Sequence, residues 1–224
     1  MFSMNASHAI KADDDHDKHK KYYEFHQKYD EIREGLKEAL RLLSIYLPNA
    51  KKYALDLGAG CGRSTVPLIK AGWLVKPVDN AELAPIYMKK RCDKHHLPMP
   101  KMLKKSFNEL SDNDFLDSSG NKPTLIVANN SLPFSGNAKN FSVLWQKIVN
   151  SLEPGSFIYC SFFGNKHSWV NKHEHKLVFH SREEVRNLLK EFKVLYFLEE
   201  DREDLSVSGN KDRWHLFTII ARKL

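Results

Sequence analysis

The strongest helical pattern in the chain lies before residue 50. Apolar residues recur there at every third or fourth position, at Tyr22, Phe25, Tyr29, Ile32, Leu36, Leu40, Leu43 and Leu47. That spacing places them on one face of an amphipathic helix, and the Pro48-Asn49 pair that follows ends the pattern. The sequence therefore predicts an N-terminal helix over residues 18–47, preceded by a flexible leader over residues 1–17.

Beyond this helix the chain alternates short β-rich runs with helical stretches. Seven runs are strand candidates, namely 53–57, 74–79, 101–106, 124–129, 156–162, 193–199 and 214–221. Alternation of this kind predicts a doubly wound α/β sheet, parallel in most of its strands, with helices on both faces. No helical pattern fits the polar segment DREDLSVSGNKD between the last two strands. We therefore expect a long hairpin loop there and an antiparallel last strand.

Two of the intervening helices have clear signals of their own. An apolar stripe before the fifth strand consists of Phe141, Leu144, Trp145, Ile148, Val149 and Leu152. Farther on, Ser181 is followed three residues later by Glu184, which is the pattern of a capping box at the start of a helix. Both signals support a single α/β core over residues 53–224.

The first strand ends in an acid and a glycine-rich turn, within ALDLGAGCGRSTVPL. Gly58, Gly60 and Gly62 follow Asp56. They expose backbone at the carboxyl edge of the sheet, where a ligand can approach without meeting a Cβ. A helix starting near Arg63 would direct its free N–H groups at that ligand. These features predict a site for a nucleotide-like molecule.

Spacing narrows the choice of nucleotide. The dinucleotide fingerprint G-x-G-x-x-G needs a glycine where this chain has Arg63, so the pattern here is G-x-G-x-G. The next strand ends in Asp79, whose carboxylate can accept hydrogen bonds from both hydroxyls of a ribose. Sites for NAD also use such an acid, so Asp79 indicates an adenosine cofactor without choosing one.

These residues resemble a known family. DLGAGCG followed by VDNA is similar to motifs I and II of class I S-adenosylmethionine-dependent methyltransferases, and LEPGS resembles the turn before their fifth strand. VANNSLPF, FFGNKHSW and RWHLFTIIARK look similar to bacterial tellurite-resistance-type or small-molecule methyltransferases. The resemblance covers residues 20–224. It implies a Rossmann-like sheet with an N-terminal lid helix, a single methyltransferase domain over residues 18–224, and S-adenosylmethionine as cofactor.

The resemblance also implies roles for individual positions. The implied cofactor-binding residues are Asp56, Gly58, Ala59, Gly60, Gly62, Arg63, Asp79, Asn80, Phe107 and Asn129. Among them Phe107 would stack on the adenine, and Asn130 beside Asn129 would line the methyl-transfer site. NSLPF differs from the N-P-P-Y motif of amino-methylating nucleic-acid enzymes, because Ser131 and Leu132 replace its first proline. This difference argues against DNA as the acceptor.

The sequence indicates the methyl acceptor less clearly than it indicates the cofactor. Methyl transfer from a sulfonium needs alignment and exclusion of water, and no covalent nucleophile. Candidate acceptor contacts are Tyr23 on the lid helix, Trp169 and Trp214, for which ordinary core packing is the alternative. His167 and His215 are candidate general bases, with structural histidines as the alternative. The pairs His95-His96 and His173 with His175 lack further ligands at suitable spacing, so we expect no metal.

Charge and composition bear on partners and location. The net charge is +7, and seven basic residues between Lys89 and Lys105 face one acid, Asp93. Such a basic cluster invites a nucleic-acid function, but a solvated face is the simpler interpretation. If the helix after Asp79 runs away from the carboxyl edge, residues 89–101 lie toward the opposite edge from the cofactor. No apolar window is long enough to span a bilayer and no secretory signal is present, which favours a cytoplasmic protein.

The sequence as a whole therefore predicts a cytoplasmic methyltransferase that acts on a small molecule by in-line displacement. We expect no nucleic-acid or membrane partner and a monomer or homodimer. One alternative is an RNA or protein methyltransferase, which the net charge favours. The other is a non-catalytic module that binds S-adenosylmethionine.

Overall fold

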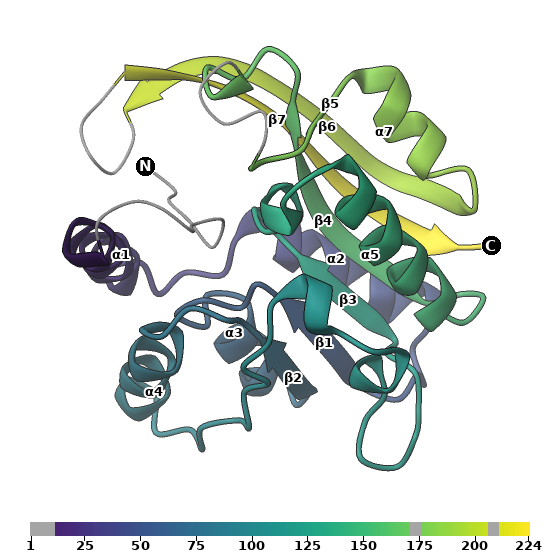
Figure 1. The fold of residues 1–224 in the computed structure, drawn as a ribbon. Helices are drawn as coiled ribbons and strands as arrows, with labels where there is room; N and C mark the ends of the chain where they lie inside the picture. The colour runs from purple at the N-terminus through teal and green to yellow at the C-terminus, as the bar shows by residue number, and fades with distance from the viewer. Residues whose placement is uncertain (1–11, 171–175, 206–210) are drawn as a thin grey trace.

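The computed structural model describes residues 12–170, 176–205 and 211–224, and Figure 1 shows their arrangement. One sheet has the strand order β2-β1-β3-β4-β7-β6, and β5 pairs with β4 beside this path. The strands are β1 (Tyr53–Leu57), β2 (Leu74–Val78), β3 (Leu125–Ala128), β4 (Phe157–Gly164), β5 (Phe179–His180), β6 (Phe192–Leu205) and β7 (Lys211–Lys223). Neighbours from β2 to β4 are parallel, whereas β7 is antiparallel to both β4 and β6. The predicted α/β sheet with an antiparallel last strand is confirmed.

Helices cover both faces of this sheet (Figure 1). On one face, α2 (Glu34–Tyr46) and α3 (Thr65–Lys70) pack against side chains such as Ala54 and Val127. On the other, α5 (Ala138–Ser151) and α7 (Arg182–Leu188) pack against Leu55 and Ile126. Adjacent residues of one strand thus enter opposite cores, because side chains alternate across a strand. Both predicted helix signals are confirmed, including the capping box at Ser181.

The predicted strand over residues 101–106 is wrong. Only Leu103 pairs with the sheet, through an isolated parallel bridge to Val78. The Leu103 N–H donates to Pro77 O at 2.8 Å, and the Lys105 N–H then turns back to Leu103 O at 3.1 Å, so the chain leaves the sheet after one residue. The count of seven strands holds because β5, which the sequence pattern did not reveal, is the remaining member.

The long hairpin loop predicted between the last two strands is also mostly strand. β6 and β7 stay paired as far as Leu205 and Lys211, and only residues 206–210 lie outside the described chain. Opposite charges face each other across this extension, with Arg213 Nε donating to Asp201 Oδ1 at 2.7 Å. Cross-strand pairs of opposite charge stabilise a sheet, which explains how so polar a segment remains extended.

The N-terminal segment forms two helices where the apolar spacing predicted one. α1 (Ala12–Gln27) begins inside the expected leader, of which residues 1–11 lie outside the described chain, and α2 follows after a break at residues 28–33. Leu36 of α2 packs under the sheet, whereas Tyr23 of α1 packs beside α4 (Ala84–Lys94). The apolar spacing in the sequence runs on through the break, so it could not show that the two helices pack on different surfaces. No helix in the described ranges is long and apolar enough to cross a bilayer.

Candidate cofactor and acceptor site

The glycine turn joins the end of β1 to α3 at the carboxyl edge of the sheet. Gly58, Gly60 and Gly62 all have positive φ, at 74°, 53° and 81°. The N–H groups of Gly58 and Ala59 donate to Val78 O at 2.8 and 3.0 Å, which fastens the turn to the end of β2. α3 begins at Thr65, two residues later than the sequence predicts, and hydrogen-bonded turns fill the interval. The left-handed backbone is the reason that glycine stands at these positions.

Asp79 lies directly against this turn. Its Oδ2 accepts a hydrogen bond from the Gly60 N–H and its Oδ1 accepts one from the Ala81 N–H, both at 2.8 Å. Asp79 is only 6% exposed. These two bonds from backbone N–H groups orient the carboxylate beside the turn. The acid predicted to meet a ribose is therefore held in a fixed orientation beside the backbone of the turn.

Asp56 lies under the turn on β1. The Thr65 hydroxyl donates to its Oδ2 at 2.6 Å. Burial raises the pKa of this carboxyl to about 6, while the Thr65 hydrogen bond and the positive charge of Arg33 act in the opposite direction. A buried carboxyl with few partners resists ionisation because the charged form loses its hydration.

The end of β3 closes the second side of the site. Asn130 has a φ of 56°, its N–H donates to Ser161 Oγ at 2.6 Å, and that hydroxyl donates to Asn130 Oδ1 at 2.9 Å. The Ser131 hydroxyl donates to Leu57 O at 2.6 Å, and a Cβ at Gly58 would stand only 2.3 Å from the Ser131 Cβ. The structure thus brings the half-buried Asn129 and Asn130 to the loop that packs against the glycine turn, and their role at a methyl-transfer edge stays a prediction.

The helix α1 packs over the turn as a lid. Tyr23 is 4% exposed, and its ring carbon Cε1 would be 3.5 Å from a Cβ on Gly60. The ring stacks on Tyr87 of α4 with centroids 5.2 Å apart. Burial, reinforced by the negative charge of Asp79, holds the pKa of the Tyr23 phenol well above its ordinary value. Arg63 extends to the end of this helix and to the break after it, with Nη1 3.4 Å from His26 Nδ1 and the guanidinium 5.3 Å from the Tyr29 ring.

Neither a protein-family model nor a curated protein matches this sequence. Solved structures do match it. TehB from Haemophilus influenzae has a TM-score of 0.65 at 17% identity, covering 84% of this chain and 62% of that chain. An S-adenosylmethionine-dependent methyltransferase from Methanosarcina mazei has a TM-score of 0.58 at 22% identity, covering 82% and 97%. The 1,6-didemethyltoxoflavin-N1-methyltransferase of Burkholderia thailandensis, solved with its acceptor and S-adenosylhomocysteine, has a TM-score of 0.60 at 17% identity, covering 97% and 92%.

The chain has the class I methyltransferase fold. It spans about 62% of the length of the TehB chain that it matches. Structural matches at such low identity establish the fold alone, and the chemistry has to be argued from the residues of the site.

Within this methyltransferase fold, the two candidate bases are held by backbone groups. His167 Nδ1 accepts the Trp169 N–H at 3.2 Å. His215 Nδ1 accepts the Lys166 N–H at 3.1 Å, and its Nε2 lies 3.0 Å from Glu199 Oε1. A neutral imidazole whose Nδ1 accepts a hydrogen bond carries its proton on Nε2. These contacts favour the structural alternative for both histidines over the role of a base.

The predicted acceptor tryptophans lie in one apolar cluster at the end of β4. We call the buried residues Phe163, Trp169, Leu177 and Trp214 the aromatic cluster. The two indole rings are 5.5 Å apart. Trp169 and Trp214 are 3% and 8% exposed, so the cluster packs as a small core beside the sheet edge.

The remaining predicted positions lie around the turn. Asn80 is half-buried directly after Asp79. Phe107 is half-buried at the start of a short 3₁₀ helix, η1 (Phe107–Glu109), and packs against the main core. Its role as the partner of adenine stays a prediction. Of the expected histidine pairs, His173 and His175 lie outside the described residues, and within those residues no three metal-ligating side chains gather.

The basic cluster corrects one prediction. Arg91 lies in its middle, yet it is 3% exposed and its Nε donates to Cys61 O of the glycine turn at 3.0 Å. α4 therefore brings this residue to the cofactor side, and the expectation that residues 89–101 lie far from the site is wrong for Arg91. Sequence reasoning missed it because a run of basic residues is ordinarily a solvated face. The spacing of Met88 and Cys92, both fully buried, is the signal that marks the inner face of this helix.

Proposed function

We propose that the protein is an S-adenosylmethionine-dependent methyltransferase that acts on a small-molecule acceptor. The observation that carries the proposal is the position of Asp79, whose carboxylate is fixed by the Gly60 N–H beside the G-x-G-x-G turn. A carboxylate at the end of the second strand, facing exposed backbone at the end of the first, suits an adenosine ribose. The fold shared with methyltransferases, one of them solved with S-adenosylhomocysteine, supports the same cofactor.

The residues present fit this cofactor. Among the described residues, a Cβ built at Gly60 meets only the Tyr23 ring within 4 Å, so the turn offers open backbone on its outer side. We assign the ribose hydroxyls to Asp79 and the methionine portion to the backbone of residues 58–62. A pKa of about 6 leaves Asp56 mostly ionised at neutral pH, which suits a nearby ammonium group.

When bound, S-adenosylmethionine supplies a methyl group on a sulfonium, which is an activated leaving group. The protein's own residues then have to align the acceptor and exclude water. Asn130, fixed through Ser161, presents its side chain at the methyl-transfer edge, and Tyr23 covers the turn from above. No proton needs to pass to His167 or His215 in this scheme, and the acceptor enters with a lone pair available.

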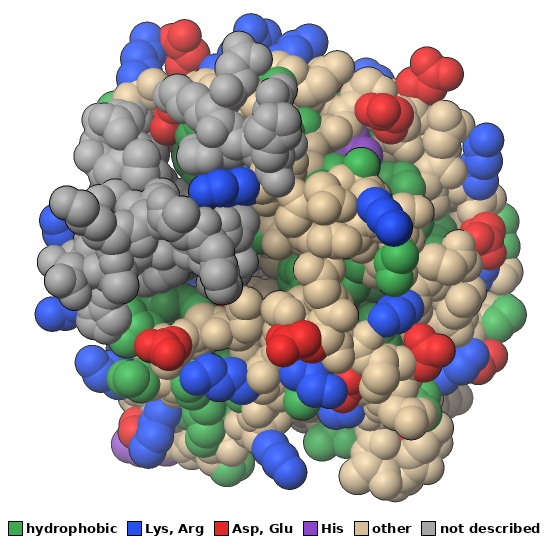
Figure 2. Space-filling model, viewed as in Figure 1, with side chains coloured by type: hydrophobic (Ala, Val, Ile, Leu, Met, Phe, Trp, Pro, Cys, Tyr) green, Lys and Arg blue, Asp and Glu red, His purple; other side chains and the backbone are tan. Residues whose placement is uncertain are grey.

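Two observations favour a small molecule over a nucleic acid. The aromatic cluster includes Phe163, which lies on β4 two residues after the Ser161 that bonds Asn130, and an apolar wall at this end of β4 suits an apolar or aromatic acceptor. The basic cluster is partly neutralised, because Lys89 pairs with Asp93 and Lys105 with Asp114. On the face in Figure 2, basic and acidic side chains are interspersed. The cytoplasmic location and the monomeric or homodimeric state stay predictions of the sequence.

Isothermal titration calorimetry tests the cofactor. We expect saturable heat with S-adenosylhomocysteine and none with NADH, and the reverse pattern would overturn the proposal. Turnover with a panel of small acceptors then separates an enzyme from a non-catalytic module. Retention of RNA that falls steeply between 50 and 200 mM salt, roughly the range over which phosphate contacts weaken, would favour the RNA methyltransferase instead.

A further inference from the structure

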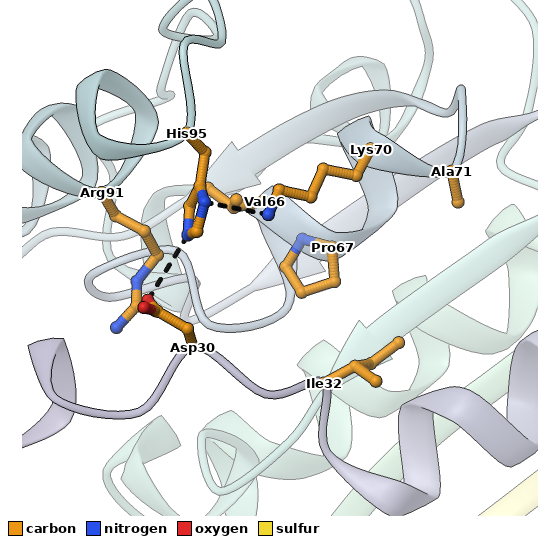
Figure 3. Close-up of a pocket in the computed structure, with 8 residues that line it drawn as sticks. All are labelled: Asp30, Ile32, Val66, Pro67, Lys70, Ala71, Arg91 and His95. Atoms are coloured by element: carbon orange, nitrogen blue, oxygen red, sulfur yellow. Dashed lines mark hydrogen bonds and ion pairs between the residues drawn. The ribbon is translucent and has the colours of Figure 1, made fainter.

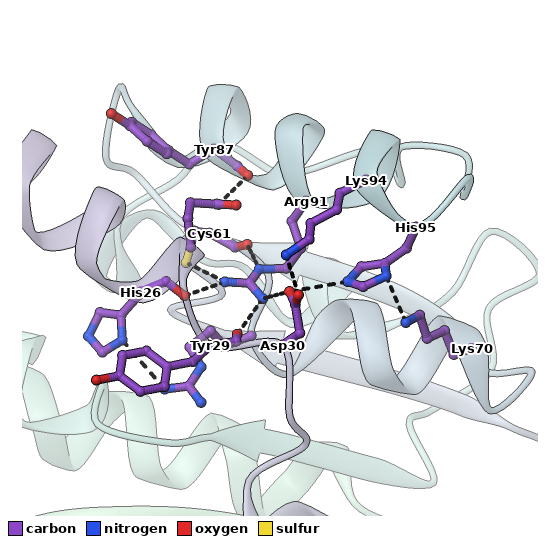
Figure 4. A network of polar contacts seen from close by, with 11 residues as sticks. His26, Tyr29, Asp30, Cys61, Lys70, Tyr87, Arg91, Lys94 and His95 are labelled. Atoms are coloured by element: carbon purple, nitrogen blue, oxygen red, sulfur yellow. Dashed lines mark hydrogen bonds and ion pairs between the residues drawn. The ribbon is translucent and has the colours of Figure 1, made fainter.

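Arg91 on α4 is a buried arginine that no step of the proposed reaction uses. Besides its bond to Cys61 O, its Nη2 donates to His26 O at 2.6 Å and its Nη1 donates to Tyr29 O at 2.8 Å (Figure 4). Three carbonyls thus accept from one guanidinium. A planar fork of five donors can serve several acceptors at once, whereas a lysine ammonium is a single point charge.

The three carbonyls belong to two different parts of the site. Cys61 lies inside the glycine turn, between Gly60 and Gly62, whereas His26 and Tyr29 lie at the end of α1 and in the break that follows. The last carbonyls of a helix have no partner within the helix, and the negative end of its dipole favours a cation. Arg91 therefore caps the lid helix and holds the cofactor turn with the same group.

The other polar contacts around the break are more exposed. Asp30 Oδ1 lies 3.5 Å from Arg91 Nη1, and the same carboxylate contacts Lys94 and His95. His95 in turn lies 2.9 Å from Lys70 Nζ (Figure 4). Solvent screens exposed ion pairs of this kind, which contribute little individually. The buried bonds of Arg91 are therefore stronger than these ion pairs, and they act beside the Gln27–Tyr87 O hydrogen bond of 2.8 Å and the packing of Tyr23 on Tyr87.

Apolar packing does not replace that link on the α3 side of the break. A pocket of about 360 Å³ lies there, bounded by Asp30 and Ile32 of the break and by Val66 and Pro67 of the α3 helix (Figure 3). Arg91 forms part of the wall of the same pocket. Because close packing is what makes a segment rigid, the break has room to move while Arg91 holds its carbonyls.

We propose that Arg91 is a positioning residue that couples the lid to the cofactor. Contact with S-adenosylmethionine restrains the glycine turn further and with it Cys61 O, so Arg91 is held more firmly in the orientation that also bonds the carbonyls of α1 and the break. The lid is then held most firmly over the turn when the turn is occupied. The inference rests on the proposed cofactor, and Arg91 acts on it through Cys61 without touching it.

Hydrogen–deuterium exchange of the full chain with and without S-adenosylhomocysteine tests this coupling. In the wild type we expect the ligand to slow exchange both in residues 57–62 and in residues 20–30, with the same saturation curve. Arg91→Lys keeps the charge but loses the fork, so the turn should still gain protection while residues 20–30 gain none. Its affinity for S-adenosylhomocysteine should fall about fivefold to tenfold because lid closure no longer contributes.

Arg186→Lys is the matched control, because it makes the same exchange at an exposed position in the last turn of α7. It should behave as the wild type. Equal ligand-induced protection of residues 20–30 in Arg91→Lys and wild type would overturn the coupling. If Arg91→Lys does not fold, the experiment on the wild type decides. Ligand-induced protection of the turn without protection of residues 20–30 would overturn the coupling but would leave the proposed cofactor supported. If the ligand protects neither segment, the proposed cofactor is wrong, and the coupling that rests on it is wrong too.

Discussion

The glycine turn and the aromatic cluster hold their shapes by different means. The turn is a backbone structure, in which Gly58, Ala59 and Gly60 all donate N–H groups to acceptors at the end of β2. The aromatic cluster is a side-chain structure, in which rings from β4, the segment after it and β7 pack together. A hydrogen-bonded turn fixes atoms within narrow limits, whereas an apolar cluster tolerates substitutions of similar volume. The cofactor side of the site is therefore the less tolerant of change.

The largest effect that we expect comes from Gly58→Ala. The new Cβ would stand 2.3 Å from the Ser131 Cβ, at a φ of 74°. Overpacking and a left-handed alanine together should lower the free energy of unfolding by about 3 kcal/mol. Urea unfolding measures this loss. Gly120→Ala is the control, because Gly120 has a φ of 78° and, apart from its chain neighbours, no atom of the described residues lies within 4 Å of the added Cβ, so it should lose only about 1 kcal/mol. Equal losses would show that the close approach to β3 does not matter.

The second prediction concerns the charge under the turn. The folded pKa of Asp56, about 6, exceeds its ordinary value of 3.8, so the folded protein keeps a proton that the unfolded chain releases between these values. Stability from this group is present below pH 4 and is lost as the pH rises through 6. The free energy of unfolding of Asp56→Asn, relative to that of wild type, should therefore rise by about 2 kcal/mol between pH 4.5 and pH 8.

Urea unfolding of both proteins at these two pH values measures the difference. A pH-independent difference would show that Asp56 ionises in the folded protein as easily as in the unfolded chain. Asp117→Asn is a useful contrast, because hydrogen bonds from Lys51 and Asn121 hold the pKa of the Asp117 carboxyl far below its ordinary range. The stability from Asp117 is present above the ordinary pKa of 3.8 and is lost as the pH falls below it, so the difference between this variant and wild type should change in the opposite sense and only below about pH 4.

Asp79→Ala should weaken the binding of S-adenosylhomocysteine at least tenfold, or about 1.4 kcal/mol, because a charge-assisted contact to the ribose is lost. The substitution also removes the acceptor of the Gly60 N–H, so the thermal stability of the variant has to be measured beside its affinity. Calorimetry with the folded variant gives the answer. An unchanged affinity would separate Asp79 from the cofactor and leave it a purely structural anchor.

The smallest effect should come from the aromatic cluster. Trp214→Phe keeps an aromatic ring among Phe163, Trp169 and Leu177, and we expect its affinity for S-adenosylhomocysteine to stay within about twofold of wild type, a difference of about 0.4 kcal/mol. The Michaelis constant for an acceptor should rise instead. A cofactor affinity that falls as far as in Asp79→Ala would contradict the division of the site into two sides.

The sequence predicted those parts of the site that lie close together along the chain. The glycine spacing and Asp79 predicted the turn, and the structure shows that only about twenty residues separate their hydrogen-bonded partners. Short β-rich runs predicted six of the strands, and period-3.6 patterns predicted helices that cover them, because burial of an element leaves a direct trace in the order of its residues. The missed strand β5 has two residues, too few to leave such a trace.

Tertiary structure decided the rest. Apolar spacing continues through residues 28–33, yet the chain breaks there because Tyr23 and Leu36 pack on different surfaces. His167 and His215 were both candidate bases in the sequence, and only the fold shows that a backbone N–H donates to the Nδ1 of each.

Arg91 belongs by sequence to a basic run, and only the packing of α1 over α4 places it under the lid. A repeating pattern records which face of an element is buried. It does not record against what that face packs, and for Arg91, as for both histidines, that partner determines the role.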